Sequence, residues 1–403
     1  MTTSVIDLTD LALFTGGDPH AVWKELRAEH PVYWNATAQG GFWALTRMED
    51  VTAAYVDAAA FSSRQGTVLG GSYRREADSA SGRMLIASDD PQHRLLRQQI
   101  HKAFLPELVE RARRAVRGGV RAALDRFQNE GGGDFAREVA PELPAGLLAV
   151  MFGLGRTDAL HLLSLTRSMI GFQDPAYRSS SAGATGLAAT QVEIFDFITA
   201  LVEERRRSPA EDLVTILLNA TVNGRGLTED EILYNCLNVA VGGNETTPFT
   251  AAAAVQTLID WPDQAAVLNS EPDCLPTALD EIFRWTSTNA YVQRTATRDI
   301  DLHGRRIGAG DSVTLWNASA NRDESQFADA DRFDVRRTPN RHIAFGVGAH
   351  RCIGMGLAQM EVGLLLQEIA TRRLRFEPDG PPRQLRSNFM LGPTHLPVQV
   401  RLP

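Results

Sequence analysis

Apolar residues recur at three- and four-residue spacing over long stretches of the chain, which is the pattern of amphipathic helices. The clearest stretches are HAVWKELRAEH, PELVERARRAVRGGVRAALDRFQN, QVEIFDFITALVEERRR and MGLAQMEVGLLLQEIATRRL. Strand-like runs with Gly and Asp turns are short and few: PVYWN, GFWALT, DIDLHGRRI, DSVTLWN and LPVQVRL. The pattern predicts a mainly α protein with small peripheral β-sheets.

Two long stretches, residues 62–88 and 172–188, show neither period and contain many Gly and Ser residues. Long irregular segments in a compact protein are functional lids or plain surface loops, and the sequence leaves both open. Since no Ser/Gly/Pro-rich linker divides the 403 residues, we expect one domain over residues 1–403.

Composition and charge restrict the partners. The net charge of −8 argues against nucleic-acid binding. No apolar run approaches the ~20 residues that span a bilayer, and the N-terminus lacks the basic and apolar regions of an export signal. The three cysteines, Cys236, Cys274 and Cys352, are far apart in sequence, which fits a reducing compartment and no zinc cage. We expect a cytoplasmic monomer without a nucleic-acid or membrane partner.

Cys352 lies in the unusual stretch FGVGAHRCIG. Glycines 346, 348 and 354 allow close backbone approach or positive φ. His350 and Arg351 add positive charge, and an amphipathic helix is expected after Gly354, so its N-terminal dipole also favours a thiolate. From this loop alone, an inert buried cysteine in a glycine turn remains the alternative.

This stretch resembles the haem-binding signature of cytochromes P450, with Phe345, Gly348, His350, Cys352 and Gly354 at the matching positions. The resemblance runs from about residue 22 to the C-terminus, with every landmark in the expected order. It implies the P450 fold, a triangular and mainly helical prism. It also implies haem b (iron protoporphyrin IX) with Cys352 as the axial thiolate ligand, which donates electron density to the iron.

A second landmark is EIFR, in which Glu281 and Arg284 share a helix face. Taken alone, such a pair is an ordinary surface contact. In the P450 family it joins an arginine of a later loop, which Arg332 of FADADRFD matches, although Ala330 replaces or shifts the usual proline. The implied role is structural, namely a buried charge network that holds the cysteine loop.

The third landmark is VGGNETTPF, residues 241–249. Two glycines inside a helical pattern cost about 1 kcal/mol each, so a helix end is the plain alternative. The stretch resembles the P450 oxygen-binding groove, whose acid–alcohol pair matches Glu245 and Thr246 as proton-delivery residues. Because Pro248 has no N–H, the carbonyl of Asn244 loses its helical partner. We predict a kink there, with a water or a threonine side chain bonded to that carbonyl.

The fourth landmark is a set of basic residues. His93 and Arg97 are four residues apart, as in the family's propionate-binding motif, and Arg294 and His350 match two further propionate contacts. Any one of them alone would be an ordinary surface charge, but together they supply the charge that two propionates need. The full cofactor-binding set implied by the resemblance is His93, Arg97, Arg294, Phe345, His350 and Cys352.

The resemblance also implies a monooxygenase that uses O2 and two electrons to oxidise a small organic substrate. The haem domain occupies all 403 residues, so the electrons would come from a separate ferredoxin and ferredoxin reductase. An acidic ferredoxin could dock on basic residues, although a solvated helix face is an equal reading of them. The basic residues are Lys102, Arg111, Arg113, Arg114 and Arg351.

Substrate contacts are expected, by family position, at Leu237, Asn238, Val241, Gly242, Asn289, Tyr291 and Phe389. Asn238 and Asn289, with Thr288 and Gln293 nearby, suggest a hydrogen-bonding natural product of secondary metabolism or antibiotic biosynthesis, such as an amino-acid-derived or glycosylated one. One alternative is oxidative cyclisation, coupling or nitration without net hydroxylation. The other is a non-catalytic haem-binding protein, against which the Glu245–Thr246 pair argues.

Overall fold

Helices form most of the computed structural model, which describes residues 6–69, 79–177 and 184–401. Residues 70–78 and 178–183, in the two irregular stretches singled out above, lie outside the described residues. The α-helices are α1 Leu11–Thr15, α2 Pro19–Glu29, α3 Met48–Val56, α4 Gln92–Ile100, α5 Pro106–Asn129, α6 Phe135–Glu138, α7 Glu142–Met151, α8 Arg156–Ile170, α9 Ala184–Arg207, α10 Leu213–Leu218, α11 Glu229–Asn244, α12 Thr246–Asp260, α13 Pro262–Ser270, α14 Leu275–Thr286, α15 Asn317–Ala320 and α16 Met355–Arg372. Short 3₁₀ turns are η1 Leu85–Ala87, η2 His101–Phe104 and η3 Pro272–Cys274.

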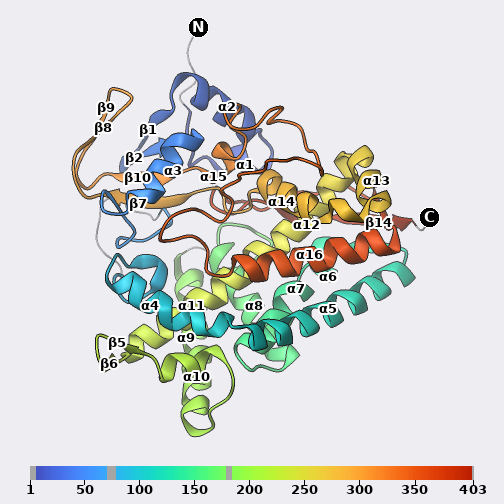
Figure 1. Cartoon of the computed structure of the whole chain (residues 1–403), viewed down its shortest axis with the longest axis horizontal. Coiled ribbons are helices and arrows are strands. Elements are labelled where there is room, and N and C mark those ends of the chain that lie inside the picture. Colours follow the sequence, from blue (N-terminus) through green and yellow to red (C-terminus); the bar gives the residue numbers. More distant parts are fainter. Residues whose placement is uncertain (1–5, 70–78, 178–183, 402–403) are drawn as a thin grey trace.

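The strands are short and lie mostly toward one side of the molecule (Figure 1). They are β1 Val32–Thr37, β2 Gly40–Leu45, β3 Phe61–Ser62, β4 Gly132–Asp134, β5 Thr221–Val222, β6 Arg225–Gly226, β7 Val292–Ala296, β8 Ile300–Leu302, β9 Arg305–Ile307, β10 Ser312–Leu315, β11 Arg375–Pro378, β12 Arg383–Gln384, β13 Pro393–His395 and β14 Pro397–Arg401. All five strand-like runs read from the sequence form strands. The predicted mainly α fold with small sheets is confirmed.

The largest sheet has the strand order β1-β2-β10-β7-β3. Its pairs are antiparallel except β2 with β10, which run parallel with Val313 opposite Trp43. Parallel pairing needs a long crossover, and here almost the whole helical part of the chain lies between the two strands. The sheet thereby brings residues near 43 and near 313 together, and β7 places Arg294 beside them.

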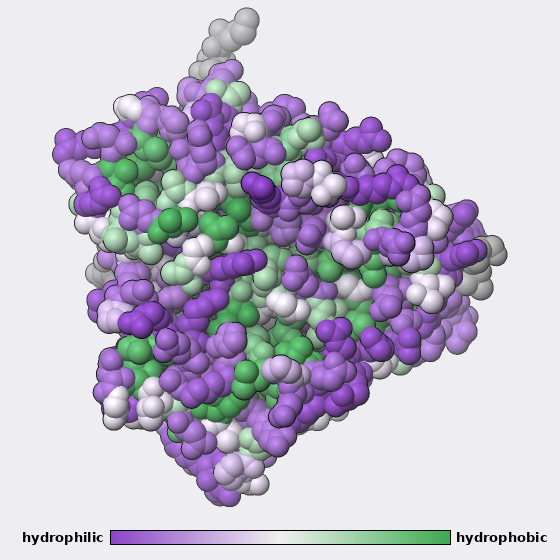
Figure 2. Space-filling view, in the orientation of Figure 1, coloured by the Kyte–Doolittle hydropathy of each residue, from purple (hydrophilic) through white to green (hydrophobic). Residues whose placement is uncertain are grey.

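Helices α4 to α12 and α16 share the largest apolar core. In Figure 1 the orange-red α16 crosses the middle of the molecule next to the yellow α12, and the two helices are in contact. The space-filling view has a roughly triangular outline, with apolar residues in separate patches between polar ones on this face (Figure 2). Among the described residues no single helix is long and apolar enough to cross a membrane. The segments Phe135–Met151 and Arg156–Ile170 are long and apolar enough only when taken together, and the chain bends by 114° between them.

The start of α11 is fixed by a capping box. The Thr228 hydroxyl accepts from the amide of Glu231 at 3.3 Å, and the Glu231 carboxylate accepts from the amide of Thr228 at 2.8 Å. At its other end α11 stops at Asn244, and α12 begins at Thr246 after a break at Glu245. The kink predicted from Pro248 is therefore confirmed, three residues before the proline.

Candidate functional site

The loop before α16 holds Cys352 in a tight backbone turn. Gly348 has φ +72°, and a Cβ there would lie 2.8 Å from the carbonyl oxygen of Tyr55, so no side chain fits without a shift. The Cys352 amide donates to the carbonyl of Phe345 at 2.9 Å, which closes the loop. Phe345 itself packs on Phe283, with ring centroids 4.7 Å apart. The loop thus lies between α3 and α14. Cys352 comes just ahead of α16, and its side chain keeps some solvent-accessible area although protein atoms surround it closely.

The protonation of Cys352 differs from the sequence expectation. Burial among surrounding atoms raises the pKa of the thiol, whereas the Gly354 amide and the guanidinium groups of Arg97 and Arg351 lower it. The net direction is upward. The positive features named from the sequence are present, but without a metal ion they do not outweigh desolvation. A bound metal cation would favour the thiolate directly.

His93, Arg97, Arg294 and His350 come together beside this loop, and we call them the cation cluster. The His93 and His350 rings lie 3.9 Å apart between centroids. Burial, together with the nearby charges of Arg294, His93 and Arg97, lowers the pKa of His350 to about 2. The four residues come from α4, β7 and the cysteine loop, in agreement with their proposed common role.

The cation cluster suits an anionic ligand. His93 is 3% exposed, and its Nε2 is buried without a hydrogen-bond partner in the part of the chain that the structure describes, although its Nδ1 lies 3.6 Å from Asp90. Arg294 is 4% exposed, donates to the carbonyl of Gln293 and lies over the ring of Tyr55. The lowered pKa values leave His93 and His350 neutral, so Arg97 and Arg294 carry the positive charge, and such charge away from water needs negative charge nearby. The two carboxylates of haem would supply it, so the residues present fit that cofactor.

The charge network behind the loop is present, but its later arginine is Arg337, not Arg332. Glu281 forms two hydrogen bonds with Arg284, at 2.7 and 2.8 Å, and both residues are fully buried. Arg337 Nε reaches both oxygens of Glu281, at 3.2 and 3.1 Å. Arg332 is exposed and contributes only its carbonyl oxygen, which accepts from Arg284 and Arg337.

Replacing Arg337 by methionine is expected to lower the free energy of unfolding by about 3 kcal/mol, because a buried carboxylate loses one of its two cationic partners. The matched change Arg332→Met should alter it by less than about 0.5 kcal/mol, since that side chain is exposed. Urea unfolding of both variants measures this. Equal destabilisation by the two changes would contradict the assignment.

The break between α11 and α12 contains buried polar atoms without partners. Glu245 is 2% exposed, and its Oε1 has no hydrogen-bond partner among the described residues. Burial raises the pKa of Glu245 to about 7, against the lowering effect of Arg167 and of a hydrogen bond with Thr166. The Oδ1 of Asn244 is also without a partner in the described part of the chain. A carboxyl that titrates near neutral pH is therefore next to Thr246.

The threonines of α12 do not bond to the carbonyl of Asn244, so the threonine alternative of the kink prediction is wrong, and the water alternative stays a prediction. Thr246 Oγ1 donates to the carbonyl of Gly242 at 3.5 Å, and Thr250 Oγ1 to the carbonyl of Thr246 at 3.0 Å. The hydroxyl of Thr247 instead donates to Glu361 Oε2 at 3.2 Å. Because a hydroxyl has one hydrogen to donate, none of these three threonines also donates to the carbonyl of Asn244.

Glu361 of α16 is a buried acid that the sequence reading missed. It is 1% exposed, burial raises its pKa to about 8, and the hydrogen bond from Thr247 opposes this rise. The signal was available: Glu361 lies on the helix face of Leu357, Leu364 and Leu365, all of which are buried. A carboxyl group on an apolar helix face is buried, so it either pairs with a positive group or is protonated and neutral.

We expect Glu361→Gln to remove a pH dependence of stability. A carboxyl whose folded pKa of about 8 exceeds its reference value of 4.5 stabilises the fold at low pH, and that stability is lost as the pH rises from about 4.5 to about 8. Relative to the variant, the wild type should lose roughly 3–5 kcal/mol over this range. Unfolding at pH 5 and pH 8.5 tests it, and parallel pH profiles of the two proteins would contradict it.

The residues expected to contact substrate divide into two groups. Asn238, Val241, Gly242, Asn289 and Phe389 are at least partly accessible. Leu237 is 8% exposed within the helical core, and Tyr291 is 1% exposed and packs against Trp316, with centroids 4.8 Å apart. These two side chains belong to the core, because their neighbours are apolar core residues.

The polar side chains of the same region already have protein partners. Thr288 Oγ1 lies 2.8 Å from Thr250 Oγ1, and Asn317 Nδ2 donates to Asn289 Oδ1 at 3.3 Å. Gln293 Nε2 donates to Ser312 Oγ at 3.4 Å. Thr288 and Asn289 are therefore bonded within the protein, whereas Gln293 Oε1 has no hydrogen-bond partner among the described residues.

Comparison with known proteins gives one family. Residues 184–400 match the family model described as Cytochrome P450. A linalool 8-monooxygenase from Pseudomonas putida is 35% identical over 403 residues, which covers 97% of this chain and 98% of that protein.

Two solved structures are similar over nearly the whole chain. P450 OxyD, involved in the biosynthesis of vancomycin-type antibiotics, has a TM-score of 0.88 and 31% identity, and the match covers 99% of this chain and 100% of that one. CYP268A2 of Mycobacterium marinum, in complex with pseudoionone, has a TM-score of 0.89 and 28% identity, with 99% and 98% covered.

Proposed function

Because the chain belongs to the cytochrome P450 family and is a P450 monooxygenase, we propose that it binds haem b through Cys352 and oxidises a small organic substrate in secondary metabolism. The observation that carries the proposal is Cys352 in a closed loop beside the cation cluster. When bound, haem supplies the activation of dioxygen. His93, Arg97, Arg294 and His350 would hold its two propionates, and Phe345 would keep the loop closed.

Glu245 and Thr246 would handle the protons that oxygen chemistry consumes. A carboxyl with a pKa of about 7 exists in both protonation states near neutral pH, so it can give up and regain a proton there. Arg167 and Thr166 contact or face it from α8, which ties its protonation to that helix. The Thr246 hydroxyl, at the first residue of α12, would orient the proton acceptor.

Electrons would come from a ferredoxin and its reductase. Among the basic residues considered, Arg111 pairs with Glu211, and Arg113 and Arg114 both pair with Glu110. The other two have neutral partners: Lys102 donates to Gln99, and Arg351 contacts the sulfur of Met355. Arg351 also lines a 390 Å³ surface pocket formed partly by the cysteine loop. An acidic ferredoxin would dock there, close to Cys352.

For the substrate we propose a largely apolar, uncharged molecule. Of the accessible residues, Val241, Gly242 and Phe389 are apolar and Asn289 is bonded to Asn317, which leaves Asn238 as the polar side chain among them. The names of two similar proteins point the same way, since one oxidises linalool and the other was solved with pseudoionone. The amino-acid-derived or glycosylated substrate expected from the sequence stays a prediction beside it.

Oxidative cyclisation or coupling of an amino-acid-derived substrate is the second candidate. It is favoured by the similarity to OxyD of vancomycin-type antibiotic biosynthesis. The two candidates predict different binding, because a peptide-like substrate needs several hydrogen-bonding groups that remain free in the pocket.

The test is a CO-difference spectrum, followed by a screen for substrate-induced spin-state shifts with two compound sets, apolar terpene alcohols and ketones against aminoacyl derivatives. Turnover of hits with ferredoxin, reductase and O2, with product analysis, completes it. Hits in the first set and a product with one added oxygen are expected. Hits only among aminoacyl derivatives would overturn the substrate proposal, and a folded protein without the thiolate–CO band would overturn the whole.

A further inference from the structure

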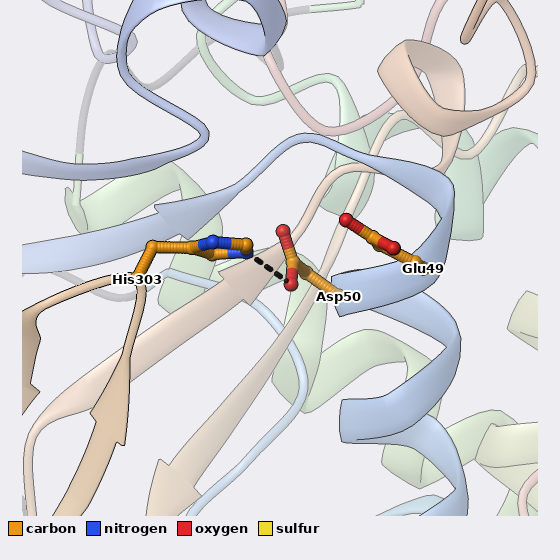
Figure 3. A group of neighbouring side chains, drawn as sticks. All are labelled: Glu49, Asp50 and His303. Atoms are coloured by element: carbon orange, nitrogen blue, oxygen red, sulfur yellow. Dashed lines mark hydrogen bonds and ion pairs between the residues drawn. The ribbon is translucent and has the colours of Figure 1, made fainter. Parts of the chain in front are cut away.

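Three potential metal ligands lie together on the sheet side of the molecule, away from the cysteine loop. Glu49 and Asp50 are in the first turn of α3, and His303 is at the turn of the β8–β9 hairpin. Their ligand atoms all lie within 4.8 Å of one another. Figure 3 shows the His303 ring and the Glu49 carboxylate on opposite sides of Asp50.

One oxygen of Asp50 lacks a partner. The side chain is 5% exposed, and Oδ1 lies 2.9 Å from His303 Nε2. Oδ2 is buried and has no hydrogen-bond partner among the described residues. In Figure 3 this oxygen points into the space between the His303 ring and Glu49. A His303–Asp50 ion pair accounts for Oδ1 but leaves Oδ2 desolvated and unpaired, which is costly.

We propose that Glu49, Asp50 and His303 form a binding site for a divalent transition-metal cation, with Zn²⁺ as the best match. One imidazole and two carboxylates are ligands that Zn²⁺ takes, and small rotations of the exposed Glu49 and His303 would bring them to bonding distance. Mg²⁺ and Ca²⁺ prefer oxygen-only sites, so the imidazole selects against them. With three protein ligands, water would complete the coordination.

The charges around Glu49, Asp50 and His303 determine how tightly a divalent cation is expected to bind. The two carboxylates can offset the cation's double charge, and His303 is neutral when it acts as a ligand. Two features oppose binding: the positive end of the α3 dipole and the nearby Arg47. We therefore expect micromolar affinity, not the tight binding of a closed structural site.

A metal ion here would connect the hairpin to α3. The last turn of α3 carries Tyr55, against which the glycines of the cysteine loop pack. The first turn of the same short helix would hold the ion. Occupancy should therefore stabilise the sheet-side part of the fold. This inference is independent of the proposed substrate and of turnover.

The test uses haem-loaded protein, so that Cys352 is not a competing ligand, stripped with a chelator and titrated with Zn²⁺ against a chromophoric chelator. Wild type should bind one equivalent more than His303→Ala, and only wild type should gain thermal stability from that equivalent. His395→Ala is the matched control, because His395 also pairs with an aspartate, Asp134, but belongs to no such three-residue group in the described chain.

Asp50→Asn gives an independent check, since it keeps the side-chain volume while removing the charge. Its affinity for Zn²⁺ should fall at least tenfold, and Mg²⁺ should not compete in the wild type. Equal Zn²⁺ stoichiometry and affinity in wild type and His303→Ala would overturn the proposal. Loss of one equivalent of bound Zn²⁺ in the control variant His395→Ala would also overturn the proposal.

Discussion

Cys352→Ser is expected to abolish the thiolate-type CO-difference band and to reduce turnover to background. The reason is that Cys352 is the sulfur beside the cation cluster, and an alcohol oxygen is a much weaker donor to iron than a thiolate. The loop itself should persist, because the Cys352 amide, which donates to Phe345, is unchanged. Absorption spectra of the reduced, CO-treated protein measure this directly.

Cys274→Ala is the control for that experiment. Cys274 is 8% exposed in η3 and packs in the core around α14, so its loss should leave the spectrum unchanged. Cys236 is fully buried in the helical core, and the pKa of its thiol is raised by burial, which makes it an unsuitable ligand. A normal thiolate–CO band in Cys352→Ser would contradict the assignment of the ligand.

Glu245→Gln is expected to slow product formation by roughly 100-fold, which is within the range for loss of a proton-transfer group. The variant should also lose the pH dependence centred near pH 7, because Gln cannot titrate where Glu245 does. Substrate binding, measured by the spin-state shift, should change little. Rates of product formation from pH 6 to pH 8.5 provide the comparison.

Glu245→Asp and Thr246→Ser separate the chemistry from the structure. Both keep the functional group, so both should retain far more activity than Glu245→Gln and Thr246→Ala. Thr246→Ala should still consume electrons and O2, but it should form hydrogen peroxide from them in place of product. Full coupled turnover in Thr246→Ala, or an unchanged pH profile in Glu245→Gln, would remove the role assigned to that residue.

The sequence predicted those parts of the site that lie in contiguous motifs. The cysteine loop, the Glu281–Arg284 pair and the break near Glu245 were all predicted, because each depends on spacing within one element. Arg337 was not. Which arginine reaches Glu281 depends on the path of an irregular loop, and Arg332, five residues earlier, has a similar local sequence.

Properties set by tertiary neighbours were beyond the sequence. The upward pKa shift of Cys352 comes from burial by several elements, although the local charges were identified correctly. In the same way, the sequence does not show that the side chain of Asn289 accepts a hydrogen bond from Asn317, which lies 28 residues later. The period-3.6 pattern marks Leu237 as apolar but cannot tell a core position from a pocket wall.

The break at Glu245 divides residues 229–260 into two helices, α11 as the first half and α12 as the second. The second half is tied down on two sides, by Thr247 to Glu361 and by Thr250 to Thr288. The first half, α11, packs on α7, α8 and α9, and within the described part of the chain no side-chain hydrogen bond joins it to α16. Substitutions in α11 that spare Asn235, which is bonded to Arg83 and Leu85, should therefore leave the link between α12 and α16, the helix after Cys352, intact. Libraries restricted to α8 and α11 should yield a higher share of folded, haem-loaded variants than libraries in α12.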